Sequence, residues 1–157
     1  MYIANDILIP ELTRLLNEEK EVRFTPAGTS MRPFIEGGRD SVVLAPLTRE
    51  PKRGDIVLAR ALMPDGRMSY VLHRIIRITL HSQLSSSNYT YILQGDGNLE
   101  GEESCRREDI IGRVIAVERP SGTRHSSIRP SRMAGLIWYH LRPWRPFLLK
   151  LYRKCVL

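Results

Sequence analysis

Five short runs rich in Val, Ile and Leu occupy the middle of the chain, and each is bounded by Gly, Pro or polar residues. Runs of this composition and length favour strands over helices. They cover residues 41–44, 55–59, 70–80, 89–93 and 110–117. Between two of them, Pro64-Asp65-Gly66 is typical of a hairpin turn. The sequence therefore predicts a mainly β fold, with its strands between residues 22 and 119.

The two ends of the chain have helical patterns instead. In residues 5–20 the apolar residues Ile9, Leu12 and Leu16 recur at helical spacing, which predicts a short N-terminal helix. With 157 residues the chain suits one ordinary domain. We expect an N-terminal helix in 1–21, a β domain in 22–119, a Ser-, Arg- and Pro-rich flexible linker in 120–132 and a helical tail in 133–157.

The formal charge of +7 is distributed unevenly. Residues 1–118 hold 15 cations and 17 anions, a net charge of −2, whereas the remainder holds nine cations and no anion. A charge asymmetry of this kind usually marks an interaction segment. The β domain itself is slightly acidic, so a nucleic-acid partner is not favoured, and the tail has no recognisable nucleic-acid-binding motif.

Composition excludes several classes of protein. A content of 42% hydrophobic and 26% charged residues is that of a globular chain. Cys105 and Cys155 cannot form a disulfide framework, and no Cys-x-x-Cys is present for a zinc or redox site. No apolar stretch is long enough for a membrane span, and no signal peptide is recognisable at the start.

A serine lies in a turn-rich segment, Gly28-Thr29-Ser30-Met31-Arg32-Pro33. Such a turn can hold a serine rigidly with its backbone N–H free, but the hydroxyl needs a base within hydrogen-bond reach to act as a nucleophile. A plain turn with no chemistry is the commoner explanation of Gly-Thr-Ser when it is taken alone.

Two further segments offer partners for this serine. His73 lies in a predicted strand, on the same face as Val71 and Ile75, and a neutral imidazole can serve as a general base. Asp96, in Gln94-Gly95-Asp96-Gly97-Asn98, can orient the imidazole as the third member of a triad. A buried structural histidine and an ordinary Asp-Gly-Asn turn are the alternatives.

Taken in order, five segments resemble the signal peptidase I family, in its archaeal and endoplasmic-reticulum branch, where a histidine replaces the lysine base. They are Gly28–Pro33, Pro51–Val57, Val71–Ile76, Gln94–Asn98 and Asp109–Val114. The resemblance covers about residues 24–118. It implies a curled antiparallel β fold, shared with LexA-type self-cleaving repressors.

The resemblance assigns roles to particular residues of this chain. Ser30 matches the nucleophile, His73 the base and Asp96 the first acidic position, while Glu102 is the nearest residue to a second acidic position. Gly28, Thr29, Met31 and Pro33 would position the serine, with Gly28 or Thr29 near a developing oxyanion. The implied activity is a serine endopeptidase that cleaves an extended leader or signal peptide through an acyl-enzyme. This acyl-transfer mechanism needs no metal and no organic cofactor.

The binding edge for the peptide and the choice between an enzyme and a binding module remain open in this prediction. The peptide would pair with an edge strand near Phe24 or Val42. A non-catalytic module that binds a peptide or a partner on the same fold is the alternative. A self-cleaving repressor is disfavoured because residues 1–21 offer one helix only, and such proteins use a lysine base.

The segment 133–157 contains both tryptophans, interleaved with Arg and Lys, and Pro143 and Pro146 divide it into two short amphipathic pieces. This pattern suits an anionic membrane surface. Packing of the apolar side against the β domain is equally compatible with it. We therefore expect a cytoplasmic or peripherally membrane-associated protein.

Overall fold

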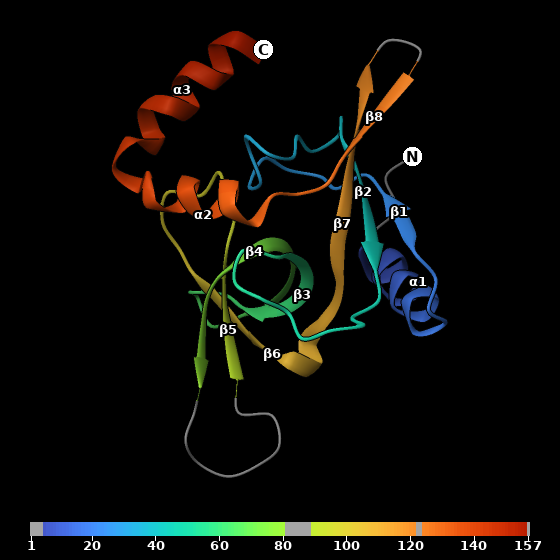
Figure 1. Cartoon of the computed structure of the whole chain (residues 1–157). Helices are drawn as coiled ribbons and strands as arrows, with labels where there is room; N and C mark the ends of the chain where they lie inside the picture. The colour runs from blue at the N-terminus through green and yellow to red at the C-terminus, as the bar shows by residue number, and fades with distance from the viewer. Residues whose placement is uncertain (1–4, 81–88, 122–123, 157) are drawn as a thin grey trace.

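The computed structural model describes residues 5–80, 89–121 and 124–156, and within these ranges the chain is mainly antiparallel β-structure (Figure 1). The strands are β1 (Val22–Phe24), β2 (Ser41–Ala45), β3 (Ile56–Leu62), β4 (Met68–Leu80), β5 (Tyr89–Gln94), β6 (Glu103–Arg106), β7 (Ile110–Ser121) and β8 (Arg124–Ile128). The helices are α1 (Asn5–Asn17), α2 (Arg132–His140) and α3 (Arg145–Val156), with 3₁₀ turns η1 (Arg107–Asp109) and η2 (Arg142–Trp144). The predicted mainly β fold with helical ends is confirmed.

The sheet curls until part of it closes on itself. Its strand order is β1-β2-β7-β3-β4-β5-β6, all neighbours are antiparallel, and β8 pairs with β7. Leu62 near the end of β3 also pairs with Ser104 of β6, so strands β3 to β6 form a small closed ring. The register of β4 on β5 shifts between Ile75 and Arg77, and such a shift bends the long strand β4.

Two hydrophobic clusters lie on either side of β3. Ile56 and Leu58 face a cluster that includes α1, β2 and β7, while Val57, Ala59 and Ala61 face the interior of the ring. Residues alternate between the faces of a strand, so a strand covered on both faces has an almost continuous apolar sequence. This explains why β3 shows no polar alternation.

The structure confirms some local predictions and corrects others. The turn at Pro64–Gly66 closes the β3–β4 hairpin, with the Met63 N–H donating to the Arg67 carbonyl over 2.8 Å. The expected linker 120–132 instead contains β8, whose polar residues Ser126 and Ser127 are exposed at the edge of the sheet. The predicted loop 82–88 lies outside the described residues.

The C-terminal segment forms two helices that meet at η2, as its prolines predicted, and Pro146 lies in the first turn of α3. Figure 1 places α2 and α3 on the other side of the sheet from α1. Gly135 and Leu149 are buried against the rest of the protein, whereas other apolar residues of this segment are exposed. No helix of the described ranges is long and apolar enough to cross a membrane.

Candidate active site

Ser30 lies in the connection between β1 and β2, which is folded into tight turns. The Arg32 N–H donates to the Thr29 carbonyl over 3.2 Å, and the Ile35 N–H donates to the Met31 carbonyl over 3.0 Å. Met31 and Ile35 are buried in the cluster under α1 and anchor the turns to the core. The sequence-predicted residue Met31 is thus placed as a support for Ser30.

The turn that follows β5 holds the Ser30 backbone from the other side. The Gly97 N–H donates to the Ser30 carbonyl over 2.7 Å. A Cβ at Gly95 would lie 2.4 Å from the Ser30 carbonyl oxygen and 3.0 Å from Nε2 of His73. Because no side chain fits in this space, glycine at position 95 allows the serine and the histidine to approach each other.

His73 lies in β4 and points into the ring, on the face that also carries Val71 and Ile75. Its Nε2 is 3.0 Å from Oγ of Ser30, which is hydrogen-bond distance. The imidazole is buried, whereas Ser30 is partly exposed. The structure therefore brings together the serine and the histidine that the sequence singled out, with the hydroxyl accessible and the base shielded.

The third member of this arrangement is Glu103, which sequence reasoning missed. Its Oε2 lies 3.0 Å from Nδ1 of His73, and its side chain is buried inside the ring. With Nδ1 as the donor to this carboxylate, Nε2 is left unprotonated and can accept the proton of the serine hydroxyl. Ser30, His73 and Glu103 thus form a hydrogen-bonded chain with the geometry of a catalytic triad.

The chain matches no known family model, no curated protein and no solved structure. The candidate site therefore rests on its own geometry.

Asp96 does not contact the imidazole as predicted. Both of its oxygens accept hydrogen bonds from Arg74, at 2.8 and 2.7 Å, in a fully buried ion pair. Burial raises the pKa of the Asp96 carboxyl, and the Arg74 guanidinium opposes this effect. Arg74 also donates to the Gly54 carbonyl and lies over the Phe34 ring. Consecutive residues of a strand face opposite sides, so an acid that meets Arg74 is directed away from His73.

Glu102 is also placed away from the imidazole. Its carboxylate accepts a hydrogen bond from Arg77 over 2.9 Å in a partly exposed ion pair. The next residue, Glu103, begins β6 and shares its inward face with Cys105. The resemblance therefore pointed to Glu102, whereas the acid that contacts His73 is the next residue, Glu103.

The remaining predicted residues surround the serine without polar side chains directed at its hydroxyl. Gly28 has a φ of +85°, which favours glycine, and Gly37 packs so closely that a Cβ there would lie 2.0 Å from the Gly28 carbonyl oxygen. Thr29 contributes the carbonyl that closes the turn on Arg32. Pro33 follows a cis peptide bond and is partly buried.

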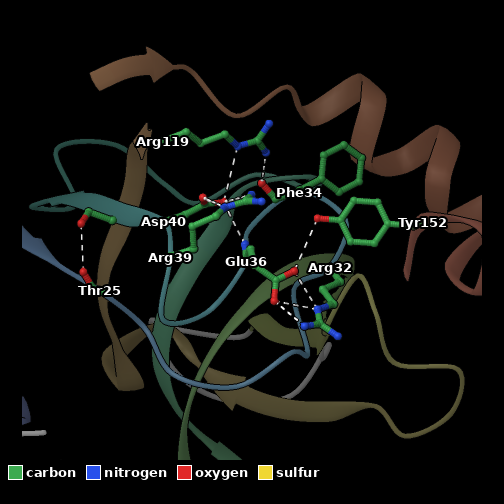
Figure 2. A network of polar contacts seen from close by, with 9 residues as sticks. Thr25, Arg32, Phe34, Glu36, Arg39, Asp40, Arg119 and Tyr152 are labelled. Carbon is green, nitrogen blue, oxygen red and sulfur yellow. Dashed lines mark hydrogen bonds and ion pairs between the residues drawn. The ribbon is translucent and has the colours of Figure 1, made fainter. Parts of the chain in front are cut away.

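Ion pairs fix the far end of this loop (Figure 2). Asp40 is fully buried and accepts hydrogen bonds from Arg39 and from the Glu36 N–H, while Arg119 of β7 lies 3.4 Å away. Glu36 in turn accepts hydrogen bonds from Arg32. Burial alone would raise the pKa of Asp40, but the hydrogen bonds and the two guanidinium charges together lower it.

A cavity of about 180 Å³ opens beside Ser30, between the loop and β4. Most of its lining is small or apolar and includes Ala27, Gly28, Met31, Ile35 and Val71. A larger cleft of about 760 Å³ has Pro26, Gly37, Tyr70 and Leu72 in common with it and extends to Phe24 and α1. The hydroxyl of Ser30 therefore lies at the end of a continuous depression, lined by apolar side chains together with polar backbone groups.

Two backbones with an unpaired edge line this cleft. Within the described residues, β1 is the terminal strand of the sheet and pairs only with β2. Residues 70–73 of β4 pair with β3 but not with β5, whose pairing begins at Arg74. The expectation of an edge near Phe24 agrees with this topology, whereas Val42 lies in β2, between β1 and β7, and offers no free edge.

Cys105 lies in the same ring but is a poor nucleophile, and the described residues offer no metal site. Cys105 is buried, and burial raises the pKa of its thiol to about 12, so it forms little thiolate. Among residues 5–80, 89–121 and 124–156, no group of three His, Cys, Asp or Glu side chains is arranged to hold a metal ion. The chemistry that the described site supports is acyl transfer to a serine.

Proposed function

We propose that the protein is a serine endopeptidase that cleaves an extended leader or signal peptide, with a site similar to that of signal peptidase I. The observation that carries the proposal is the hydrogen-bonded chain from Ser30 Oγ through His73 to Glu103, with both distances at 3.0 Å. A nucleophile, a base and a group that orients the base form the minimal machinery for acyl transfer. Glu103 takes the role that the sequence assigned to Asp96.

In the first half of the reaction, Oγ of Ser30 attacks the carbonyl carbon of the scissile peptide and transfers its proton to Nε2 of His73. The buried Glu103 carboxylate stabilises the imidazolium through Nδ1. The tetrahedral intermediate then collapses. The C–N bond breaks, His73 returns the proton to the leaving amine, and an ester to Ser30 remains.

In the second half, water attacks this ester and His73 accepts a proton from it. Collapse of the second intermediate restores the Ser30 hydroxyl and releases a carboxylic acid. The cycle needs no cofactor, because every proton passes through His73.

The Ser30 N–H is available for the developing oxyanion. Within the described residues it donates to no backbone carbonyl, while the Ser30 carbonyl is held by the Gly97 N–H. A donor fixed before the reaction stabilises negative charge without reorganisation. Gly28 and Thr29 remain the candidates for a second backbone donor.

The substrate would bind as an extended strand along the cleft. The free edges of β1 and of residues 70–73 can donate and accept main-chain hydrogen bonds on the two sides of a peptide. The cavity beside Ser30 would accept the side chain before the scissile bond. Its volume of about 180 Å³ is enough for one side chain, and the resemblance to signal peptidases, which prefer small residues before the cut, favours a small one there.

A degenerate peptide library with small residues at alternating positions tests the proposal, with mass spectrometry to detect cleavage. We expect cleavage after small residues by the wild type, and a loss of at least about 10³-fold in Ser30→Ala and in His73→Ala. Ser126→Ala and His140→Ala are matched controls, because both residues are exposed and neither lines the cavity or the cleft.

Wild-type rates in either site variant would exclude the dyad. Retention of library peptides on the immobilised wild type without cleavage would instead support a binding module on the same fold. The cleft and its strand edges serve that alternative equally well, so cleavage is the deciding measurement.

A further inference from the structure

The two C-terminal helices carry large apolar side chains on their outer surface. These residues are between 50% and 68% exposed, although they belong to helices that are packed on the protein. They are Met133, Ile137, Trp144, Phe147 and Leu151. Together with the cations Arg132, Arg142, Lys150, Arg153 and Lys154, we call them the C-terminal face.

Helical spacing aligns four of these apolar residues, while Trp144 lies in η2 between the two helices. Met133 and Ile137 are four residues apart in α2, as are Phe147 and Leu151 in α3. Residues four apart lie on the same side of a helix. The buried residues Arg145 and Leu149 mark the opposite side of α3, which faces the protein. Each helix therefore has one apolar surface that is already covered and another that is not.

The charges next to the exposed apolar residues have one sign. Lys150 and Lys154 follow Phe147 and Leu151 by three residues each, so the ammonium groups border the apolar stripe of α3. From Arg119 to the end of the sequence there are nine Lys and Arg residues and no Asp or Glu. Exposed Trp and Phe bordered by Lys and Arg are typical of segments at a bilayer interface.

We propose that the C-terminal face docks on an anionic lipid bilayer, with Trp144, Phe147 and Leu151 inserted at the interface and the cations beside lipid phosphates. A second copy of the chain would bring the same cations against these cations, so self-association through this face is opposed by charge. An anionic bilayer matches both the apolar and the electrostatic character of the face.

Docking would also determine where the candidate active site lies. Trp138 of α2 donates from Nε1 to the Asp96 carbonyl over 2.7 Å, and Arg145 donates to the Asn98 carbonyl over 3.1 Å. The turn that contains these carbonyls also holds Ser30 through Gly97. The helices that face the lipid are thus joined directly to the turn that holds Ser30, so docking would fix the orientation of the candidate site relative to the bilayer. The lipid contact itself does not depend on peptidase activity.

Sedimentation of the full-length chain with vesicles tests the proposal, using phosphatidylcholine alone and phosphatidylcholine with 30% phosphatidylglycerol. We expect binding to the anionic vesicles that weakens as salt is raised, together with a blue shift of tryptophan emission. The variant with Trp144, Phe147 and Leu151 all changed to Ser should bind at least about tenfold more weakly. The variant Lys150→Glu with Lys154→Glu should lose a similar factor on anionic vesicles only.

The matched control removes exposed apolar side chains elsewhere. Leu62→Ser with Met68→Ser changes two exposed residues at the β3–β4 hairpin and should leave binding unchanged. Circular dichroism establishes that every variant is folded. Measuring vesicle binding in the Ser30→Ala protein as well separates docking from catalysis, because docking should be intact there even if no substrate is ever cleaved.

Three results would overturn the proposal. The first is equal affinity of the wild type for neutral and anionic vesicles, or no affinity for either. The second is an equal loss of binding in the hairpin control. The third is a wild type that sediments as a dimer without lipid while the triple Ser variant is a monomer, which would make the face an interface between copies.

Discussion

Strand β4 places two buried hydrogen-bonded pairs of different kind on its opposite faces. His73 faces the inside of the ring and meets Glu103, while the next residue, Arg74, faces α2 and meets Asp96. Both pairs are buried, but only the first reaches a hydroxyl that is open to the cleft, at Ser30. The comparison teaches that burial and a charged partner do not by themselves identify a reactive group. Access to the cleft distinguishes the two pairs.

The largest expected effect on the reaction rate concerns the inner pair, His73 and Glu103. Glu103→Gln should reduce kcat by about 10³- to 10⁴-fold, because the neutral amide no longer orients or stabilises the imidazolium. KM and the free energy of unfolding should change little, and Glu103→Asp should recover part of the rate. Steady-state kinetics on a cleaved library peptide provide the measurement. A kcat within threefold of the wild type would remove Glu103 from the mechanism.

Changes to the outer pair, Arg74 and Asp96, should lower stability rather than the rate of cleavage. Asp96→Asn leaves the buried Arg74 without a counter-charge, so we expect the free energy of unfolding to fall by about 3–5 kcal/mol. Urea denaturation measures this loss, and replacing both partners, as in Arg74→Leu with Asp96→Leu, should restore most of it. The folded fraction of Asp96→Asn should still cleave peptides. Full stability with lost cleavage would reverse the roles that we assign to the two acids.

A smaller effect is expected where α2 covers the outer pair. A Cβ at Gly135 would lie 2.1 Å from Cζ of Arg74, so Gly135→Ala must displace either the helix or the guanidinium. We expect a destabilisation of about 1–3 kcal/mol in urea denaturation, typical of overpacking. Ala134→Gly is a useful control, because it should cost only about 1 kcal/mol through helix propensity. Equal losses in both variants would mean that Arg74 has room to move.

The smallest effect involves an acid whose cationic partners reach solvent. The folded protein lowers the pKa of Asp40, so the unfolded chain binds more protons as the pH approaches the ordinary value near 4. Stability from Asp40 is therefore present above that pH and is lost as the pH falls through the lowered pKa. In thermal melts between pH 6 and pH 2.5, the free energy of unfolding should fall less steeply with decreasing pH in Asp40→Asn than in the wild type. The difference in slope should correspond to the uptake of up to about one proton. An unchanged slope would show that other carboxyls dominate.

Local sequence patterns predicted the inner face of β4 around His73, but not the partner of Arg74 on the outer face. The alternation of β4 placed His73 on the face of Val71 and Ile75, where the structure has it, and the serine singled out in the Gly-Thr-Ser-Met segment lies at hydrogen-bond distance from His73. Local patterns could not reveal that Arg74 takes Asp96, because that contact depends on how the turn after β5 folds over the strand.

Two strands were missed because their sequences are polar. Glu103-Ser-Cys-Arg106 in β6 and Arg124–Ile128 in β8 have little of the β-branched content that marks a strand. The first of these omissions also concealed Glu103, the acid that contacts His73. The one available signal was the order Glu103-Ser104-Cys105, in which an apolar residue two positions after the acid indicates a shared inward face.

Closure of the ring between β3 and β6 has a consequence for how the candidate site forms. The Ser30–His73 contact joins residues 43 positions apart, and the His73–Glu103 contact joins residues 30 apart. Contacts so distant in sequence form only when much of the chain has been organised, because loop closure comes at an entropic cost. A nascent chain that ends before Glu103 therefore lacks the complete candidate site, because Ser30 is synthesised before His73 and Glu103. If the proposed function holds, activity would appear only after residues 30, 73 and 103 have been brought together by folding.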